Sequence, residues 1–155
     1  MQMCEVLEQH KKITAAMSGN WSGDEKLHPS PWDAAGGMAK GRLSARTDLD
    51  GFFVITEYQQ ECGGAVTYRG HGVYGWDPNL QCYTMNWFDS MGGGCATAAR
   101  GTWTGNTLVF THEGPMGHGR YTYTFESATR MLFRIDMSQD GKNWAPFMES
   151  VFTKA

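Results

Sequence analysis

Residues 68–94, YRGHGVYGWDPNLQCYTMNWFDSMGGG, form the stretch that decides the fold. Aromatic and glycine residues recur at every second position on both sides of the WDPN segment at 76–79. A period of two is typical of a strand whose alternate side chains face opposite sides of a sheet, and Pro-Asn is a turn signal. The stretch therefore predicts two antiparallel strands joined by a tight turn.

The rest of the chain repeats this pattern. The first strand carries Trp21, with Gly23, Glu25 and Leu27 following on the same side. Residues 4–16 instead place apolar side chains at helical spacing and predict a short amphipathic helix. About ten strands are expected, at residues 19–27, 39–46, 52–60, 68–76, 83–89, 98–103, 107–112, 120–126, 131–137 and 144–153.

Antiparallel strands in simple succession, with no helical crossover between them, favour an all-β, closed up-and-down barrel, because closure removes exposed edges. A sandwich is the alternative. Connections in such a barrel alternate between its two ends. One end would carry the short turns at 48–51, 77–80, 104–106 and 127–130. The other would carry longer, Gly-rich loops at 28–37, 61–65, 90–97, 113–119 and 138–143, which predict an open rim opposite a floor closed by the helix.

Composition restricts the class of protein. A length of 155 residues predicts one domain spanning 1–155, with the capping helix at 4–16 and the barrel at 19–155. The 13 basic and 16 acidic residues are interleaved, which excludes an electrostatic footprint for nucleic acid. No stretch approaches the roughly 20 apolar residues of a membrane span, and the first residues lack a signal-peptide core, so a cytoplasmic location is expected. The four cysteines lack CxxC spacing and are expected to be free thiols.

Several motifs carry a family resemblance over nearly the whole chain. They are HPSPW at 28–32, LDGFF at 49–53, RGHGVYGWDP at 69–78, YTMNWFDSMG at 83–92, ARGTW at 99–103 and DGKNWAPFME at 140–149. Together they resemble the bacterial family known as domain of unknown function 1579. The GNWSG run at 19–23 resembles the G-x-W opening of lipocalin-like (calycin) barrels, including nitrobindin-type haem barrels. The resemblance implies a lipocalin-like barrel and brings no activity with it.

Two expectations follow from the resemblance alone. In calycins the tryptophan of G-x-W packs under a basic residue from a late strand, and Arg134 is the candidate partner of Trp21. Nitrobindin-type barrels bind haem through a late histidine, whereas this sequence has no histidine after His118. That departure argues against haem by this route. A ligand to iron from another wall would have to be His28, His71, His112 or His118.

The predicted rim gathers the candidate functional residues. Asp89 and His112 lie at inward strand ends, where an Asp-oriented imidazole would act as a general base or fix a polar ligand group. A rim hydrogen bond without chemistry, or no contact, is the other interpretation. Glu57 and Glu149 are either internal polar anchors or solvated outward residues. The predicted ligand-binding set is His28, Trp32, Glu57, Tyr68, His71, Trp87, Asp89, Met91, His112, His118, Arg120 and Glu149.

The preferred interpretation is a barrel that binds a small, partly apolar molecule at this rim, oriented by Trp87, Asp89 and His112. The alternative is an enzyme that uses His112, Asp89 and Glu149 or Glu57 for acid–base chemistry. A structural or oligomerising barrel is the third, and a homodimer is left open. No cofactor or metal is assigned. A metal site of His28, His112, His118 and Asp89, or haem, is kept as an alternative.

Overall fold

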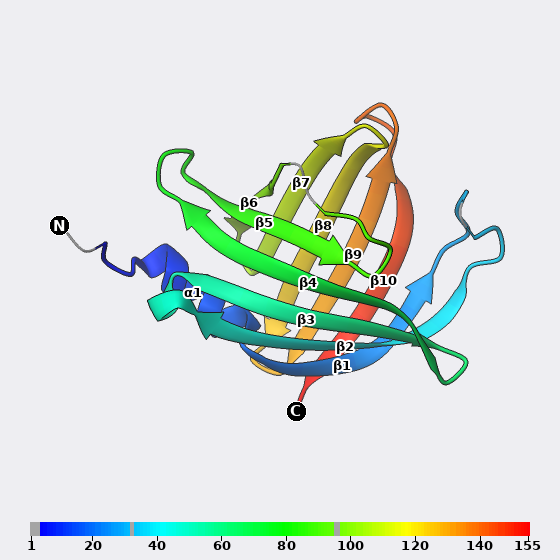
Figure 1. Ribbon diagram of the computed structural model, residues 1–155, viewed down its shortest axis with the longest axis horizontal. Coiled ribbons are helices and arrows are strands. Elements are labelled where there is room, and N and C mark those ends of the chain that lie inside the picture. Colours follow the sequence, from blue (N-terminus) through cyan, green and yellow to red (C-terminus); the bar gives the residue numbers. More distant parts are fainter. Residues whose placement is uncertain (1–3, 32, 95–96) are drawn as a thin grey trace.

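The computed structural model describes residues 4–31, 33–94 and 97–155. Its strands close into one barrel in the order β1-β10-β9-β8-β7-β6-β5-β4-β3-β2, each antiparallel to its neighbours (Figure 1). They are β1 Gly19–Leu27, β2 Gly37–Asp48, β3 Phe53–Cys62, β4 Ala65–Asp77, β5 Cys82–Asp89, β6 Ala99–Thr104, β7 Thr107–Gly114, β8 Gly117–Ser127, β9 Arg130–Ser138 and β10 Ala145–Lys154. The predicted up-and-down barrel is therefore confirmed, and the sandwich is wrong.

The β4–β5 hairpin follows the predicted alternation. Its register places Gly70 opposite Asp89, Gly72 opposite Trp87 and Tyr74 opposite Met85. Because cross-strand partners share one face of a sheet, Gly70 and Gly72 of β4 stand beside the larger Asp89 and Trp87 of β5 inside the barrel.

The rim differs from the prediction at two of its loops. Residues 61–65 and 113–119 were expected to be open loops, but β3 ends at Cys62, β4 begins at Ala65, and only 115–116 separate β7 from β8. The first turn is tight because Gly63 and Gly64 have φ values of 61° and 83°, the left-handed pair that a two-residue hairpin turn requires. The long rim loops are therefore the β1–β2, β5–β6 and β9–β10 connections.

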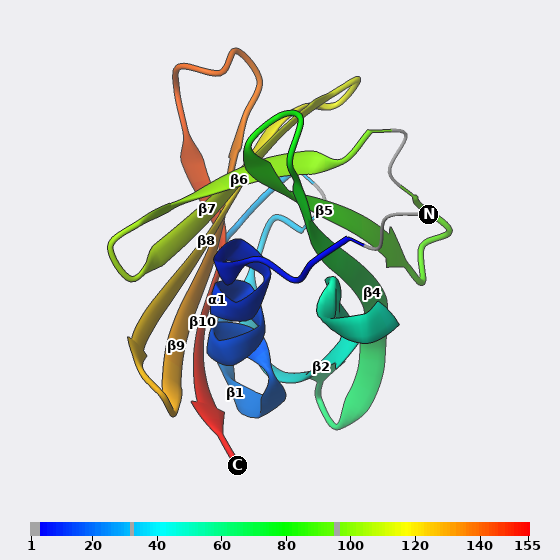
Figure 2. The same ribbon diagram turned by 90° about the vertical axis from the view of Figure 1, so that its left-hand side faces the viewer.

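Helix α1, Glu8–Met17, closes the floor end of the barrel (Figure 2). It begins later than the predicted 4–16 because Leu7 is its N-cap, with the Leu7 N–H donating to Nδ1 of His10 at 2.9 Å. Its buried face carries His10, Ile13 and Met17. The Tyr83 hydroxyl donates to the Gln9 carbonyl at 2.8 Å and ties the helix to β5. No helix in the described ranges is long and apolar enough to cross a membrane.

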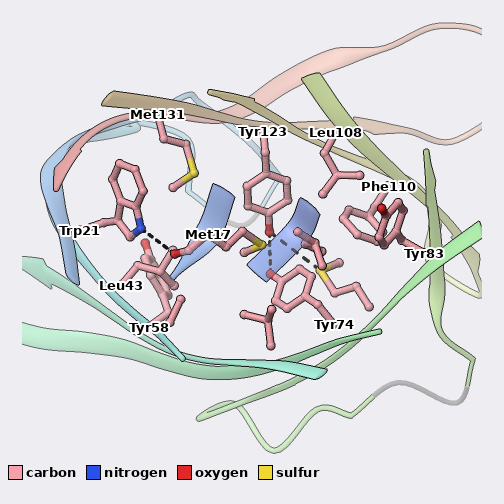
Figure 3. Packing of buried hydrophobic residues seen from close by; sticks show 14 of the residues in the cluster. Met17, Trp21, Leu43, Tyr58, Tyr74, Tyr83, Leu108, Phe110, Tyr123 and Met131 are labelled. Atoms are coloured by element: carbon pink, nitrogen blue, oxygen red, sulfur yellow. Dashed lines mark hydrogen bonds between the residues drawn. The ribbon is translucent and has the colours of Figure 1, made fainter. Parts of the chain in front are cut away.

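Aromatic rings fill the barrel between the helix and its middle (Figure 3). Tyr74, Phe110 and Tyr123 meet edge to face, with ring centroids 5.7 to 6.2 Å apart. The Tyr74 and Tyr123 hydroxyls are 2.7 Å apart, and burial raises the pKa of Tyr74 to about 12. Edge-to-face pairs add about 0.5–1.5 kcal/mol each beyond the area that they bury. We refer to this packed part as the floor half.

Trp21 packs in the floor half, but the prediction that Arg134 is its basic partner was wrong. Its indole N–H donates to the Met17 carbonyl at 2.9 Å, and Lys154 Nζ lies 5.5 Å from its ring centroid. Lys154 is the register partner of Trp21, so both face inward. Arg134 lies on the outward side of β9, where it contacts Asp136 and Glu149. A late basic residue does cover the tryptophan, but it comes from β10.

Candidate functional site

On two strands, β5 and β9, inward-facing side chains change from buried to partly accessible toward the rim. On β9, Met131 is fully buried, whereas Ile135 and Met137 on the same face are partly accessible. On β5, Met85 is buried and Trp87 is partly accessible. We call the accessible inward set the rim wall: Tyr68, Trp87, Asp89, His112, Tyr121, Phe133, Ile135 and Met137. The inner faces of these two strands are therefore buried toward the floor and partly accessible toward the rim.

Glycines of β4 and β8 make room for two aromatic rings of the rim wall. A Cβ on Gly70 would lie 2.1 Å from Cζ2 of Trp87, and one on Gly72 would lie 3.2 Å from its Cε3. A Cβ on Gly119 would lie 2.7 Å from the Tyr121 hydroxyl. Ring atoms of Trp87 therefore pack directly against the glycines of β4. This close approach explains why inward positions 70 and 72 of β4 carry glycine.

The predicted residues Tyr68, Trp87 and Asp89 come together. The Trp87 indole N–H donates to the Tyr68 hydroxyl at 2.9 Å, and that hydroxyl donates to Oδ2 of Asp89 at 3.1 Å. Backbone N–H groups of Met91 and Gly93 donate to Oδ1 of Asp89 at 3.0 and 3.4 Å. Burial raises the pKa of Tyr68, and the neighbouring carboxylate raises it further. The phenol therefore remains a neutral donor that fixes Asp89 at the rim.

The predicted His112–Asp89 pair does not form. In the described ranges the His112 ring makes its hydrogen bond with the Thr97 hydroxyl, where Nε2 and Oγ1 are 3.3 Å apart, while Asp89 is held by Tyr68 and by its own loop. The physical reason lies in the sheet. β5 pairs with β6 only from Tyr83 to Met85, so the rim end of β5 is not held against the strands that carry His112. Acid–base catalysis by this pair loses its geometric basis.

Glu25 is the residue that the sequence interpretation missed. Its side chain is fully buried on the inner face of β1. The Tyr58 hydroxyl donates to Oε1, the Ser150 hydroxyl donates to Oε2 at 2.5 Å, and the Gln60 amide donates to Oε1 at 3.2 Å. Burial raises the pKa of Tyr58, and the adjacent Glu25 carboxylate raises it further. A signal was present, because Glu25 follows Trp21 at an even interval and so shares its face.

Four other predicted residues lie on the outer face of β8–β10. Nε2 of His28 is 2.6 Å from Oε2 of Glu149, and Arg134 donates to Glu149 Oε1 at 3.2 Å. The hydrogen bond with His28 lowers the pKa of Glu149, and the charge of Arg134 lowers it further. Glu149 is therefore no internal anchor, because Met148 and Ser150 occupy the inward positions of β10.

The two remaining members of this outer group lie beside Trp144. The guanidinium carbon of Arg120 is 4.3 Å from the Trp144 ring centroid, and the His118 ring centroid is 6.5 Å from it. Arg120 also lies 3.8 Å from the Asp136 carboxylate, measured from Nη2 to Oδ2. These contacts join the β9–β10 loop to the outer wall and leave His118 and Arg120 facing away from the barrel interior.

Glu57 and His71 are also outward. They are register partners on β3 and β4, in an open outer groove of about 650 Å³ that Arg42 and Arg69 also line. Glu57 Oε1 is 3.9 Å from Nη1 of Arg46, which is a long ion pair. Met91 is 83% exposed in the β5–β6 loop. Trp32 lies outside the described residues.

The described residues do not gather into a metal site, and one of the four proposed haem ligands, His112, faces the barrel interior. No group of three or more His, Cys, Asp or Glu side chains within those ranges could hold a metal ion. His28 and His118 face the outer wall of β8–β10 and His71 that of β3–β4, which leaves His112 as the inward-facing candidate. Three of the four proposed haem ligands are thus on the wrong side of the barrel wall. Cys4, Cys62 and Cys82 are free thiols.

Comparisons with known proteins agree on the fold. The structure of Rv2717c from M. tuberculosis superposes with a TM-score of 0.70 at 10% sequence identity, covering 94% of this chain and 97% of that one. The S-type phycobiliprotein lyase CPES from Guillardia theta superposes with a TM-score of 0.65 at 9% identity, covering 94% and 92%. A comparison with curated proteins finds no match. The family described as Protein of unknown function (DUF1579) matches residues 6–154, and the chain therefore belongs to this family.

Proposed function

We propose that this protein binds a small, partly apolar molecule in the rim half of its barrel. The change along the inner faces of β5 and β9 carries the proposal, since their inward side chains are buried toward the floor and partly accessible toward the rim. A barrel filled by its own side chains would bury the inward positions along its whole length. Ile135 and Met137 of β9, with Trp87 of β5, would contact the apolar part of the ligand.

Two further observations support the proposal. Tyr68 and Asp89 form a fixed polar group at the edge of an apolar wall, which is the usual composition of a small-molecule site. The phycobiliprotein lyase has a barrel of the same fold. This likeness supports a role in which the present barrel binds another molecule. The free described cysteines suit a reducing compartment, and we place the protein in the cytoplasm as part of the same proposal.

Binding of the neutral dye Nile red tests the proposal, with a matched pair of variants on β9. Ile135→Trp fills the rim half, whereas Leu132→Trp adds the same ring to the outer face, where Leu132 pairs with Val151. We expect the wild type and Leu132→Trp to enhance dye fluorescence equally, and Ile135→Trp to weaken binding by roughly tenfold or more.

Circular dichroism melting controls for folding of these variants, and Met137→Trp serves as the second filling variant if Ile135→Trp does not fold. Equal loss of dye binding in the inner and outer variants would contradict the proposal. No dye binding by the wild type would also contradict it.

A further inference from the structure

The polar groove on the outer face of β1–β4 is a second place in the molecule where a ligand fits. It has a volume of about 650 Å³ and lies across four strands that run side by side (Figure 1). The outward strand positions that line it are all polar, and they include the hydrogen-bond donors Ser22, Arg42, Ser44, Gln59, Arg69 and His71. Such a lining suits a hydrophilic ligand, because apolar contacts are missing while donors are plentiful.

Two arginines of this groove differ from most others on the surface. The arginines that have a carboxylate oxygen 3.0 to 3.8 Å away are Arg46, Arg120, Arg130 and Arg134. Within the described ranges, the side chains of Arg42, Arg69 and Arg100 form no ion pair and no hydrogen bond. Arg100 lies on β6, whereas Arg42 and Arg69 share the groove. Two uncompensated positive charges therefore line one concave surface.

Carboxylates are present beside these arginines, but they have other partners. Glu57 and Glu61 occupy the outward positions of β3 on either side of Gln59. Oε1 of Glu57 lies 3.9 Å from Nη1 of Arg46, and Oε1 of Glu61 accepts a hydrogen bond from the Gln59 amide at 3.3 Å. The two groove guanidiniums thus keep their charge and their donors available. A bound anion would also remove the repulsion between them.

The strand register places the two guanidiniums where one anion can contact both. Arg42 of β2 pairs with Gln59 of β3, and Gln59 pairs with Arg69 of β4. Since neighbouring strands lie about 4.8 Å apart, the Cα atoms of the two arginines are about 10 Å apart, within reach of two long side chains. The backbone of Arg69 is held on its other side by Ser90, whose hydroxyl accepts from the Arg69 N–H at 3.0 Å and whose N–H donates to the Arg69 carbonyl at 2.8 Å.

We propose that this groove binds a small phosphomonoester, with the phosphate between Arg42 and Arg69. Each guanidinium donates two parallel hydrogen bonds, so two of them suit the several oxygen atoms of a phosphate, whereas a carboxylate fills only one. A phosphomonoester carries close to two negative charges at neutral pH, which matches the two arginines. Ser22, Ser44 and His71 donate to hydroxyl groups on the carbon skeleton, so the ester is a phosphorylated sugar or polyol. The groove lies outside the barrel, and the inference is independent of the ligand proposed for the rim half.

Isothermal titration calorimetry at low ionic strength tests the inference with four probes: glucose 6-phosphate, glucuronate, glucose and inorganic phosphate. We expect glucose 6-phosphate to bind about tenfold more tightly than glucuronate or inorganic phosphate, and glucose to bind most weakly. Equal binding of glucuronate would overturn the preference for phosphate. Equal binding of inorganic phosphate would assign the groove to the free ion and overturn the ester. No binding of glucose 6-phosphate would overturn the whole inference and leave the proposed function standing.

Three variants that each remove one positive charge separate a local site from a general effect of charge. We expect Arg42→Gln and Arg69→Gln each to weaken binding of glucose 6-phosphate by about tenfold, and Arg100→Gln to leave it unchanged. All three side chains are exposed, so the fold should persist, and circular dichroism melting checks this. Nile red binding should be the same in all three. An equal loss of glucose 6-phosphate binding in the three variants, or no loss in either groove variant, would overturn the inference.

Discussion

The floor half and the rim half of this barrel are built from the same strands and the same alternation, yet they differ in what they do. At the floor, Tyr74, Phe110 and Tyr123 meet ring to ring under a helix, and the interior is solid. At the rim, ring atoms of Trp87 pack against glycines, and the opposite apolar residues on β9 stay accessible. The identity of the inward residues thus decides whether a segment of the barrel is packed core or part of the rim wall.

Pairing between strands reinforces the difference. β3 and β4 pair along nearly their whole lengths, whereas β5 and β6 share only three register pairs, all toward the floor. The rim end of β5 is therefore set by its own loop and by Tyr68 instead of by β6. One short pairing thus leaves the rim end of β5 without a partner strand on the β6 side within a closed barrel.

The largest expected effect is on floor packing. Phe110→Ala should lower the free energy of unfolding by about 3–5 kcal/mol, because Phe110 is fully buried and its removal leaves a cavity. Ile135→Ala at the rim should cost about 2 kcal/mol or less, because its side chain is already partly accessible. Urea denaturation, with the same m-value for wild type and variants, measures both changes in the free energy of unfolding. Equal losses would remove the distinction between the two halves.

The buried carboxylate comes next. Glu25→Ala should destabilise the fold by about 3 kcal/mol, because it leaves the Tyr58, Ser150 and Gln60 donors without their acceptor. Glu57→Ala, on the outer face, should change stability by less than about 0.5 kcal/mol. Urea denaturation of both variants at pH 7 is the measurement. A loss for Glu25→Ala as small as that for Glu57→Ala would show that the polar cluster is not structural.

A smaller effect is expected from the glycine that seats Trp87. Gly70→Ala should displace the indole into the interior, because the added Cβ would lie 2.1 Å from Cζ2. Dye binding should fall by about tenfold, with a loss of stability of about 1–3 kcal/mol from overpacking. Tryptophan fluorescence and Nile red titration report the two effects. Gly105→Ala, in a floor turn with open space around it, is the control, and its dye binding should be unchanged.

The smallest effect concerns pH and the floor helix. Burial lowers the pKa of His10 below its ordinary value of 6.5, so the unfolded chain takes up a proton that the folded chain resists. Stability should therefore decline as the pH falls below about 6.5, by no more than about 1 kcal/mol. Urea denaturation at pH 7.5 and 5.5 tests this, and His10→Gln should reduce the difference. A wild type that is more stable at pH 5.5 than at pH 7.5, relative to the same comparison for the variant, would contradict the sign.

The sequence was sufficient for the strands and for part of the site. Period-two alternation in 68–94 placed Tyr68, Trp87 and Asp89 on one inward face, because alternation within one hairpin is local information. The same argument applies to Glu25, which shares the phase of Trp21 and was overlooked in favour of Glu57 and Glu149. Both of those face outward, and their strands carry apolar residues on both faces, so composition alone did not separate the sides.

Contacts between distant strands could not be predicted from the alternation of residues in the sequence. The His112–Asp89 pair depended on how far β5 and β6 remain paired, and the sequence does not encode that length locally. The pairing of His28 with Glu149 joins residues 121 positions apart across a strand boundary. Alternation predicts which face of the sheet each side chain occupies. Whether side chains from distant strands meet depends on the register of several strands and on how far those strands stay paired.

Methionine methyl NMR tests the central claim most directly, because methionines lie in both halves and on the surface. On addition of Nile red, we predict shifts of the Met137 and Met148 methyl resonances near the rim and little change for Met17 and Met131 in the packed floor. Shifts confined to the exposed Met38, Met91 and Met116 would place the ligand outside the barrel. That result, or larger shifts at the floor than at the rim, would contradict ligand binding at the rim wall.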